Sequence, residues 1–207
     1  MVMSKIQTVN RDPRLKRFMP WLLVVVGIIG LICSFIIMYE KIEIYNDPNH
    51  VTVCDVNPVI SCGSVMRTDQ SNAFGFPNPI IGLVAFPVLI TIGMAIFAGA
   101  TFKRWFWIGL QFGTIFGVGF VHWLFYQSVY NIGALCPFCM VVWTVTIAMF
   151  WYTLLYNLRE GHLKTPRALT GIVAFAQRHH LDILITWYLV IIGLILYHFW
   201  YYFGSLI

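Results

Sequence analysis

Residues 133–143 read GALCPFCMVVW and place a Cys136-x-x-Cys139 pair at the start of a long apolar run. Two cysteines with this spacing at the beginning of a helix lie about one turn apart, so their sulfurs can meet with little rearrangement. The unpaired N–H groups and the dipole of a helix N-terminus stabilise a thiolate, and we expect them to favour the thiolate of Cys139. Pro137 suits the first turn, where its missing N–H costs nothing. The stretch predicts a pair that cycles between dithiol and disulfide at the edge of a membrane helix.

The composition is that of a membrane protein. The chain has 207 residues, of which 59% are hydrophobic and only 10% charged, and its mean hydropathy is +0.79. No ordinary soluble domain has so little polar surface, so we predict a polytopic, all-α membrane protein with a single domain over residues 1–207. The first apolar run is long enough to span and no small-residue cleavage pattern follows it, so we expect no cleavable signal. The predicted spans are residues 19–39, 79–102, 105–129, 136–157 and 181–203, with a long loop at 40–78.

Several other residues within the predicted spans are expected to serve packing. Gly109, Gly113 and Gly117 repeat at intervals of four in the third span, and small residues with this spacing let neighbouring helices approach closely. Cys33 lies inside the first span, where a thiol usually packs as an inert apolar group. His122 is interpreted as a packed, hydrogen-bonded histidine rather than a proton relay.

The basic residues indicate the orientation. With a cytoplasmic N-terminus, the outer side holds only Lys41 and Arg67. The cytoplasmic segments then hold Lys5, Arg11, Arg14, Lys16, Arg17, Lys103, Arg104, Arg159, Lys164, Arg167 and Arg178. This positive-inside pattern predicts a multi-pass protein of the cell inner or plasma membrane, with its C-terminus outside. The basic arm is therefore a topology signal, and we expect no nucleic-acid partner.

The same orientation places a second cysteine pair, Cys54 and Cys62, on the outer side with Cys136 and Cys139, where disulfides persist. Two pairs on one face suggest a relay, because thiol–disulfide exchange hands on two electrons without a metal. Two structural disulfides, or a metal site of four thiolates, are the alternatives. A structural staple needs no C-x-x-C, since so short a loop restricts the unfolded chain little, and the wide spacing of the first pair disfavours zinc. Asp55 either raises the pKa of Cys54 by like-charge repulsion or caps a turn.

Three motifs together resemble the vitamin K epoxide reductase family. They are Cys54-Asp55-x6-Cys62, Phe74-Gly75-x-Pro77-Asn78-x3-Gly82 and Leu135-Cys136-x-x-Cys139. The resemblance covers roughly residues 15–157, including the first four spans and the long loop. It implies a four-helix bundle around a quinone of the menaquinone, ubiquinone or vitamin K type, with a short helix of the outer loop capping the quinone.

The resemblance also implies roles for the residues at matching positions. Cys139 is the cysteine next to the quinone and Cys136 its partner, while Cys54 meets an external thiol protein and Cys62 carries electrons on to Cys136. An asparagine near the Phe-Gly step is expected to hydrogen-bond a quinone carbonyl, and two asparagines flank that step. The candidate quinone contacts are Asn72, Asn78, Trp143, Phe74, Thr68, Met66 and Phe138. No metal is expected.

Two departures from the family pattern refine this interpretation. Animal members carry a tyrosine one turn after the C-x-x-C, whereas this chain has Trp143, which can stack and donate from its N–H but cannot act as a phenol. Quinone reduction is therefore favoured over epoxide reduction. The fifth span resembles bacterial members, many of which continue into a fused thioredoxin-like domain. This chain ends at Ile207, so we expect a separate, DsbA-like thioredoxin-fold partner on the outer side, and disulfide formation in exported proteins as the outcome. The alternatives are a vitamin K epoxide or quinone reductase, and a non-catalytic membrane protein with stapled outer loops.

Overall fold

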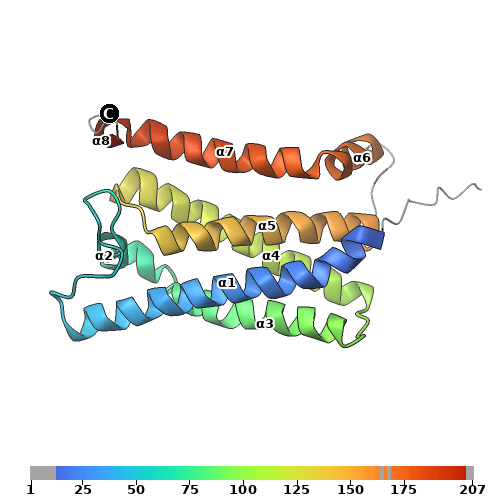
Figure 1. Ribbon diagram of the computed structural model, residues 1–207, viewed down its shortest axis with the longest axis horizontal. Helices are drawn as coiled ribbons and strands as arrows, with labels where there is room; N and C mark the ends of the chain where they lie inside the picture. The colour runs from blue at the N-terminus through green and yellow to red at the C-terminus, as the bar shows by residue number, and fades with distance from the viewer. Residues whose placement is uncertain (1–12, 164–165, 167–168, 204–207) are drawn as a thin grey trace, which may run out of the picture.

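Helices dominate the protein, whose computed structural model describes residues 13–163, 166 and 169–203. Five helices are long and apolar enough to cross a membrane, and they lie roughly side by side (Figure 1). They are α1 (Pro13–Asn46), α3 (Pro79–Phe97), α4 (Arg104–Tyr126), α5 (Pro137–Arg159) and α7 (His180–His198). The predicted all-α membrane fold is confirmed. Of the basic residues counted above, Lys5, Arg11, Lys164 and Arg167 lie outside the described residues.

A bundle of α1, α3, α4 and α5 forms the body of the molecule. α1 packs against α3 and α5, and α5 also packs against α4. Leu23 of α1, Phe86 of α3, Trp107 of α4 and Met149 of α5 belong to one buried cluster. Because lipid is as apolar as these side chains, close packing rather than escape from water holds such helices together.

The fifth long helix, α7, is attached to the bundle partly by polar contacts. Trp187 Nε1 donates to His122 Nε2 at 3.0 Å, and the Tyr188 hydroxyl donates to the Thr144 carbonyl at 2.8 Å. The other ring nitrogen of His122 lies 2.7 Å from the Val118 carbonyl, so it must donate there while Nε2 accepts. His122 is thus a packed, hydrogen-bonded histidine that links α4 to α7, as predicted.

The first helix extends beyond the end predicted for it at residue 39, and its end contains two buried charges. Glu40 and Lys41 are each 3% exposed. Glu40 Oε2 lies 3.0 Å from His50 Nε2, and Lys41 Nζ donates to the Met66 carbonyl. Charged residues usually mark the end of a span because they seek water. Here the following loop folds back over the helix and supplies their partners, so the helix continues to Asn46.

The loop after α1 contains α2 (Cys62–Met66) and a 3-10 turn, Asp69–Asn72. The Ser61 hydroxyl caps α2 by accepting from the Ser64 N–H at 3.0 Å. At the other end of the chain, the predicted basic loop contains α6 (Thr170–Arg178), and α8 (Trp200–Phe203) follows α7. These short elements lie at the two ends of the bundle (Figure 1).

Two of the three glycines expected to permit close helix contact do not do so. A Cβ on Gly109 or Gly113 would meet no atom within 4 Å, so these positions face open space. By contrast, a Cβ on Gly27 of α1 would lie 3.1 Å from the Phe86 carbonyl oxygen, and one on Gly93 of α3 would lie 2.9 Å from the Pro20 carbonyl oxygen. The tight pair is therefore α1 and α3. The sequence expectation for α4 is wrong at Gly109 and Gly113 and confirmed at Gly117, where a Cβ would lie 3.2 Å from Thr146 Cγ2 of α5.

This difference predicts opposite outcomes for the same substitution. Gly93→Leu forces a side chain against the backbone of α1, so we expect it to destabilise the bundle by about 1–3 kcal/mol or more. Gly109→Leu meets open space and replaces a poor helix former, so its melting temperature in detergent should not fall. Equal melting temperatures for the two variants would contradict this assignment of the helix contact.

Candidate functional site

Two distant segments meet where α2 begins beside the start of α5. The Leu135 N–H donates to the Val59 carbonyl at 2.7 Å, and the Ser61 N–H donates to the Leu135 carbonyl at 3.0 Å. These bonds form an isolated parallel bridge between Ile60 and Leu135. Because Cys62 and Cys136 each come directly after the bridged segments, the bridge brings the two cysteine pairs together.

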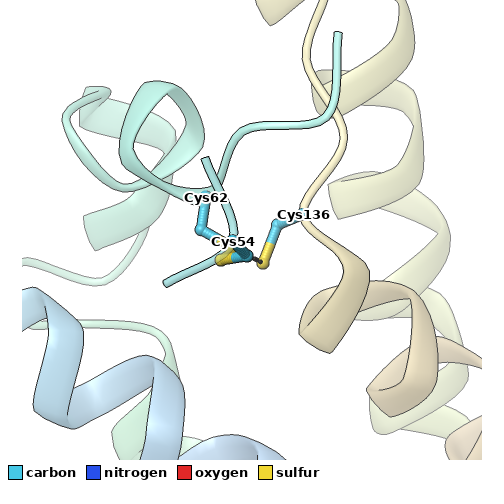
Figure 2. Close-up of side chains that lie close together, drawn as sticks. All are labelled: Cys54, Cys62 and Cys136. Carbon is cyan, nitrogen blue, oxygen red and sulfur yellow. Dashed lines mark hydrogen bonds between the residues drawn. A yellow bond between two sulfur atoms is a disulfide. The ribbon is translucent and has the colours of Figure 1, made fainter. Parts of the chain in front are cut away.

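The sulfur atoms of three cysteines are in contact at this junction (Figure 2). Cys54 and Cys62 form a disulfide, with their Cα atoms 5.6 Å apart. The Sγ atoms of Cys62 and Cys136 lie 3.0 Å apart, while Cys136 and Cys139 are free thiols. Cys54, Cys62 and Cys136 are buried. A thiol held against one sulfur of a disulfide is the arrangement that precedes thiol–disulfide exchange.

The helix N-terminus favours the thiolate of Cys136, which is the N-cap of α5. Its Sγ accepts from the Cys139 N–H at 3.4 Å, and Pro137 follows as the first helical residue. The hydrogen bond from the Cys139 side chain, helped by the N–H groups of Cys139 and Phe138, lowers the pKa of Cys136 despite burial and the charge of Asp55. The sulfur in contact with the disulfide is therefore the one whose ionised form is stabilised.

Asp55 organises the loop that carries the first pair. Its carboxylate accepts from the Ser61 hydroxyl at 2.7 Å, the Gly63 N–H at 2.9 Å and the Thr52 N–H at 3.0 Å. Burial alone raises the pKa of this carboxyl, but these hydrogen bonds together hold the pKa below its usual value. A Cβ on Gly63, in the first turn of α2, would lie 2.7 Å from the Asp55 carboxylate, so a larger residue there would displace the carboxylate. Asp55 caps the turn, which is one of the two roles considered for it.

An apolar cavity of about 480 Å³ lies within the bundle, beside the second cysteine pair. Cys139, Trp143, Met66 and Asn78 are among its lining residues. Trp143 is only 4% exposed, and its Nε1 has no hydrogen-bond partner in the described part of the chain. A buried indole N–H normally finds an acceptor. The cavity therefore presents an unused donor beside a thiol.

The other four candidate contacts do not line the cavity. The Phe74 ring packs 6.2 Å from the Phe116 ring, and Phe116 does line it. The Thr68 hydroxyl donates to the Val65 carbonyl at 2.7 Å and so closes the end of α2. Phe138 packs beside the cysteine cluster. Asn72 follows two lining residues, and its Oδ1 is buried without a partner among the described residues.

Sequence reasoning missed part of the cavity wall. Lys41 lines it, although the Glu-Lys step looked like the end of a span. Gly109 and Gly113 also line it, although their spacing suggested helix packing. The spacing of Lys41 and Tyr45, four residues apart, is a sequence signal for a cation that contacts an aromatic ring. The direction in which Gly109 and Gly113 face depends on the tertiary structure and has no such signal.

The cysteine cluster was also considered as a metal site. The Sγ atoms of Cys54, Cys62 and Cys136 lie within 4.8 Å of one another. Two of them are joined in a disulfide, which leaves one thiol where a structural zinc site requires several thiolate or imidazole ligands. In this oxidation state the cluster suits electron exchange rather than metal binding.

A disulfide and a buried thiol in contact, at one end of a bundle of membrane-type helices, define a membrane thiol oxidoreductase. The comparison with known families gives the same class. A sequence model of the Vitamin K epoxide reductase family matches residues 21–154, and the chain belongs to this family. Its general activity is therefore that of a membrane thiol and quinone oxidoreductase, and its general partner is a thioredoxin-like redox protein.

Proposed function

We propose that this protein oxidises a separate, DsbA-like thioredoxin-fold partner and passes the electrons through its two cysteine pairs to a quinone. The observation that carries this proposal is the 3.0 Å contact between the Sγ atoms of Cys62 and Cys136. It joins the disulfide of the loop to the pair whose second member, Cys139, lines the cavity. The result of the reaction is disulfide formation in exported proteins.

The relay begins at the disulfide of the loop. A thiolate of the partner attacks Cys54 Sγ, the Cys54–Cys62 bond breaks, and Cys62 leaves as a thiolate. The second thiol of the partner then displaces Cys54, which releases the partner in its oxidised form. Cys62 attacks Cys136 of a Cys136–Cys139 disulfide, and Cys54 displaces Cys136 to close the first disulfide again. The structure has this final pattern, with Cys54 and Cys62 joined and both later thiols free.

The second pair then meets the quinone. A bound quinone supplies the acceptor for two electrons and two protons, and leaves as a quinol of the menaquinone, ubiquinone or vitamin K type. Cys136 and Cys139 lose those electrons and protons and form a disulfide, so the reaction balances as partner dithiol plus quinone gives partner disulfide plus quinol. The cavity volume of about 480 Å³ lies within the usual range of ligand pockets.

Two polar groups support the fit of a quinone ring. The Trp143 N–H, unpartnered among the described residues, would donate to a ring carbonyl. Asn78 lines the cavity, but its Nδ2 donates to the Gln70 carbonyl at 2.8 Å and its Oδ1 accepts from the Ala73 N–H at 3.0 Å. The amide of Asn72 has an unpartnered buried end, and a flip of the amide would present an N–H there. Because Asn78 lines the cavity and Asn72 does not, the choice between the two asparagines stays a prediction.

The membrane orientation is part of the proposal. The basic residues of the sequence favour a cytoplasmic N-terminus. All four redox cysteines then lie on the outer side of the cell inner or plasma membrane, where the partner and its substrates are oxidised.

The proposal is tested by purified protein in detergent, supplied with a reduced thioredoxin-fold donor and a short-chain quinone. We expect the quinone to be reduced and the donor to become oxidised in equal amounts. A wild-type protein that reduces no quinone with any thiol donor would refute the relay and leave the disulfide as a structural staple.

The partner is expected to dock on an apolar rim around Cys54. Val51, Val53 and Val56 are each 72–73% exposed, whereas Cys54 between them is 6% exposed. Exposed apolar side chains next to a reactive disulfide suit contact with a protein donor. Val53→Glu should raise the KM for the protein donor about tenfold, because a charge must then be buried on docking, and should leave reduction by a small dithiol unchanged.

The matched variant Val53→Thr keeps the shape of the side chain and should have a smaller effect. Steady-state assays with both donors separate docking from chemistry. If Val53→Glu slows both donors equally, the valine has a role in the fold of the loop and not in docking.

A further inference from the structure

Lys41 is a buried cation in the wall of the cavity that holds Cys139 and Trp143. Its exposed fraction is 3%, so its ammonium group does not reach water as long basic side chains near the end of a span usually do. A lysine this fully buried is rare unless its charge is paired.

The partners of Lys41 are all uncharged. Its Nζ donates to the Met66 carbonyl and to the Ser71 hydroxyl, the latter at 2.5 Å, and lies 5.3 Å from the centre of the Tyr45 ring. Within the described ranges, no carboxylate pairs with it. The adjacent Glu40 interacts with His50 instead, at 3.0 Å.

A buried ammonium with no anion beside it is costly. Carbonyl and hydroxyl oxygens satisfy its hydrogens but leave its charge uncompensated. The cavity is otherwise mostly apolar, and a medium of this kind strengthens any charge–charge attraction within it. The counter-charge that Lys41 lacks can therefore be supplied by a molecule in the cavity.

We propose that the Lys41 ammonium stabilises the negative charge that develops on a quinone oxygen while electrons arrive from Cys139. This inference rests on the proposed function and adds a catalytic residue to it. Lys41 exchanges no electrons, since both come from Cys136 and Cys139, and the two protons of the quinol come from the same thiols. The lysine acts as a fixed charge in the cavity wall, and preorganised groups of this kind contribute strongly to catalysis.

The competing explanation is that Lys41 serves only to hold the segment of α2 and the 3-10 turn against α1, through its hydrogen bonds to Met66 and Ser71. The two explanations differ in what they predict for ligand charge. If Lys41 only maintains the shape of the cavity, its removal should weaken the binding of neutral and anionic ligands alike. If its charge stabilises an anion, its removal should weaken only the binding of the anionic ligand.

The test compares two probes in a Cys139→Ala background, so that neither is reduced. One is a hydroxynaphthoquinone that is ionised at neutral pH, and the other is the methoxynaphthoquinone of similar shape, which is neutral. Calorimetric titration in detergent should show that Lys41→Met weakens binding of the anionic probe about tenfold or more and changes binding of the neutral probe less than twofold. Lys41→Arg should retain the preference for the anion.

Ser71→Ala is the matched control, because it removes one hydrogen bond of Lys41 without removing the charge. This variant should keep the preference for the anionic probe. Lys41→Met should not lower the melting temperature, since an apolar side chain of similar length removes a buried charge. In the protein with all cysteines present, Lys41→Met should slow the oxidation of the reduced enzyme by quinone about 100-fold and leave exchange between the protein donor and Cys54 unchanged.

Equal weakening of both probes by Lys41→Met, or no weakening of either, would overturn the inference. A failure of the proposed function is recognised separately, because it requires that the wild-type enzyme reduce no quinone at all. A wild type that turns over, with no charge selectivity due to Lys41, would leave the relay intact and remove only the role given to the lysine.

Discussion

Cys139→Ala should lower quinone reduction more than about 1000-fold, because it removes the only cysteine of the redox pairs that lines the cavity. The side chain is smaller and apolar, and Cys136 remains in place against Cys62, so the fold and the first disulfide should be preserved. The measurement is the rate of quinone reduction with a reduced thioredoxin-fold donor, compared with wild type. With Cys136 unable to form its own disulfide, the relay has no route from protein to lipid.

Cys54→Ala provides the contrast that orders the relay. We expect it to fail with the protein donor, which can no longer form a mixed disulfide at the exposed rim of the loop. It should still work with a small dithiol, which can reduce the Cys136–Cys139 disulfide directly. If Cys139→Ala retained turnover, or if Cys54→Ala lost activity with both donors, the assigned order of the cysteines would be wrong.

The redox chemistry of Cys136 and Cys139 could be predicted from the local sequence. Their position at the start of a membrane helix could be predicted from the apolar composition of the residues that follow. Cys136, Pro137 and the apolar run behind them identify a helix start, and the structure begins α5 at Pro137. The five spans likewise follow from apolar length. These features depend on residues that are close in the sequence, so a single chain was enough to find them.

The meeting of the two pairs could not be derived from the residues in this way. Cys62 and Cys136 are 74 residues apart, and they meet because Ile60 and Leu135 form a bridge in otherwise irregular chain. An isolated bridge has no repeating pattern of polar and apolar residues that would announce it. The sequence expectation that the helix N-terminus favours the thiolate of Cys139 is wrong. Cys136 is the N-cap of α5, and the Cys139 side chain together with the N–H groups of the first turn lowers the pKa of Cys136 instead.

Lys41 and the glycines of α4 show a second limit of sequence reasoning. A charged pair after an apolar run usually marks the end of a span. That rule fails here because the loop after α1 supplies His50 to Glu40 and the Met66 carbonyl to Lys41. Glycines at intervals of four share one face of a helix, but the pattern does not say whether that face meets another helix or a cavity. In both cases the missing information lies on a different element of the fold.

The cavity face of α4 gives the second large prediction. Gly113 lines the cavity, and a Cβ there would meet nothing within 4 Å, so the side chain of Gly113→Phe would occupy part of the cavity. Across the cavity, Val84 of α3 also lines it and is 65% exposed, which indicates that the cavity reaches the lipid-facing surface. We expect quinone reduction to fall about 100-fold, because the substrate is excluded or displaced from Cys139.

Gly119→Phe is the matched control, because Gly119 also lies on α4 and faces open space but does not line the cavity. Both substitutions replace a glycine inside a helix by a better helix former, so both variants should melt no lower than wild type. Exchange between the protein donor and the Cys54–Cys62 disulfide should be normal in both, since that disulfide lies outside the cavity. Only Gly113→Phe should then lose quinone reduction. Normal turnover by Gly113→Phe would mean that the electrons of Cys139 leave by a route other than this cavity.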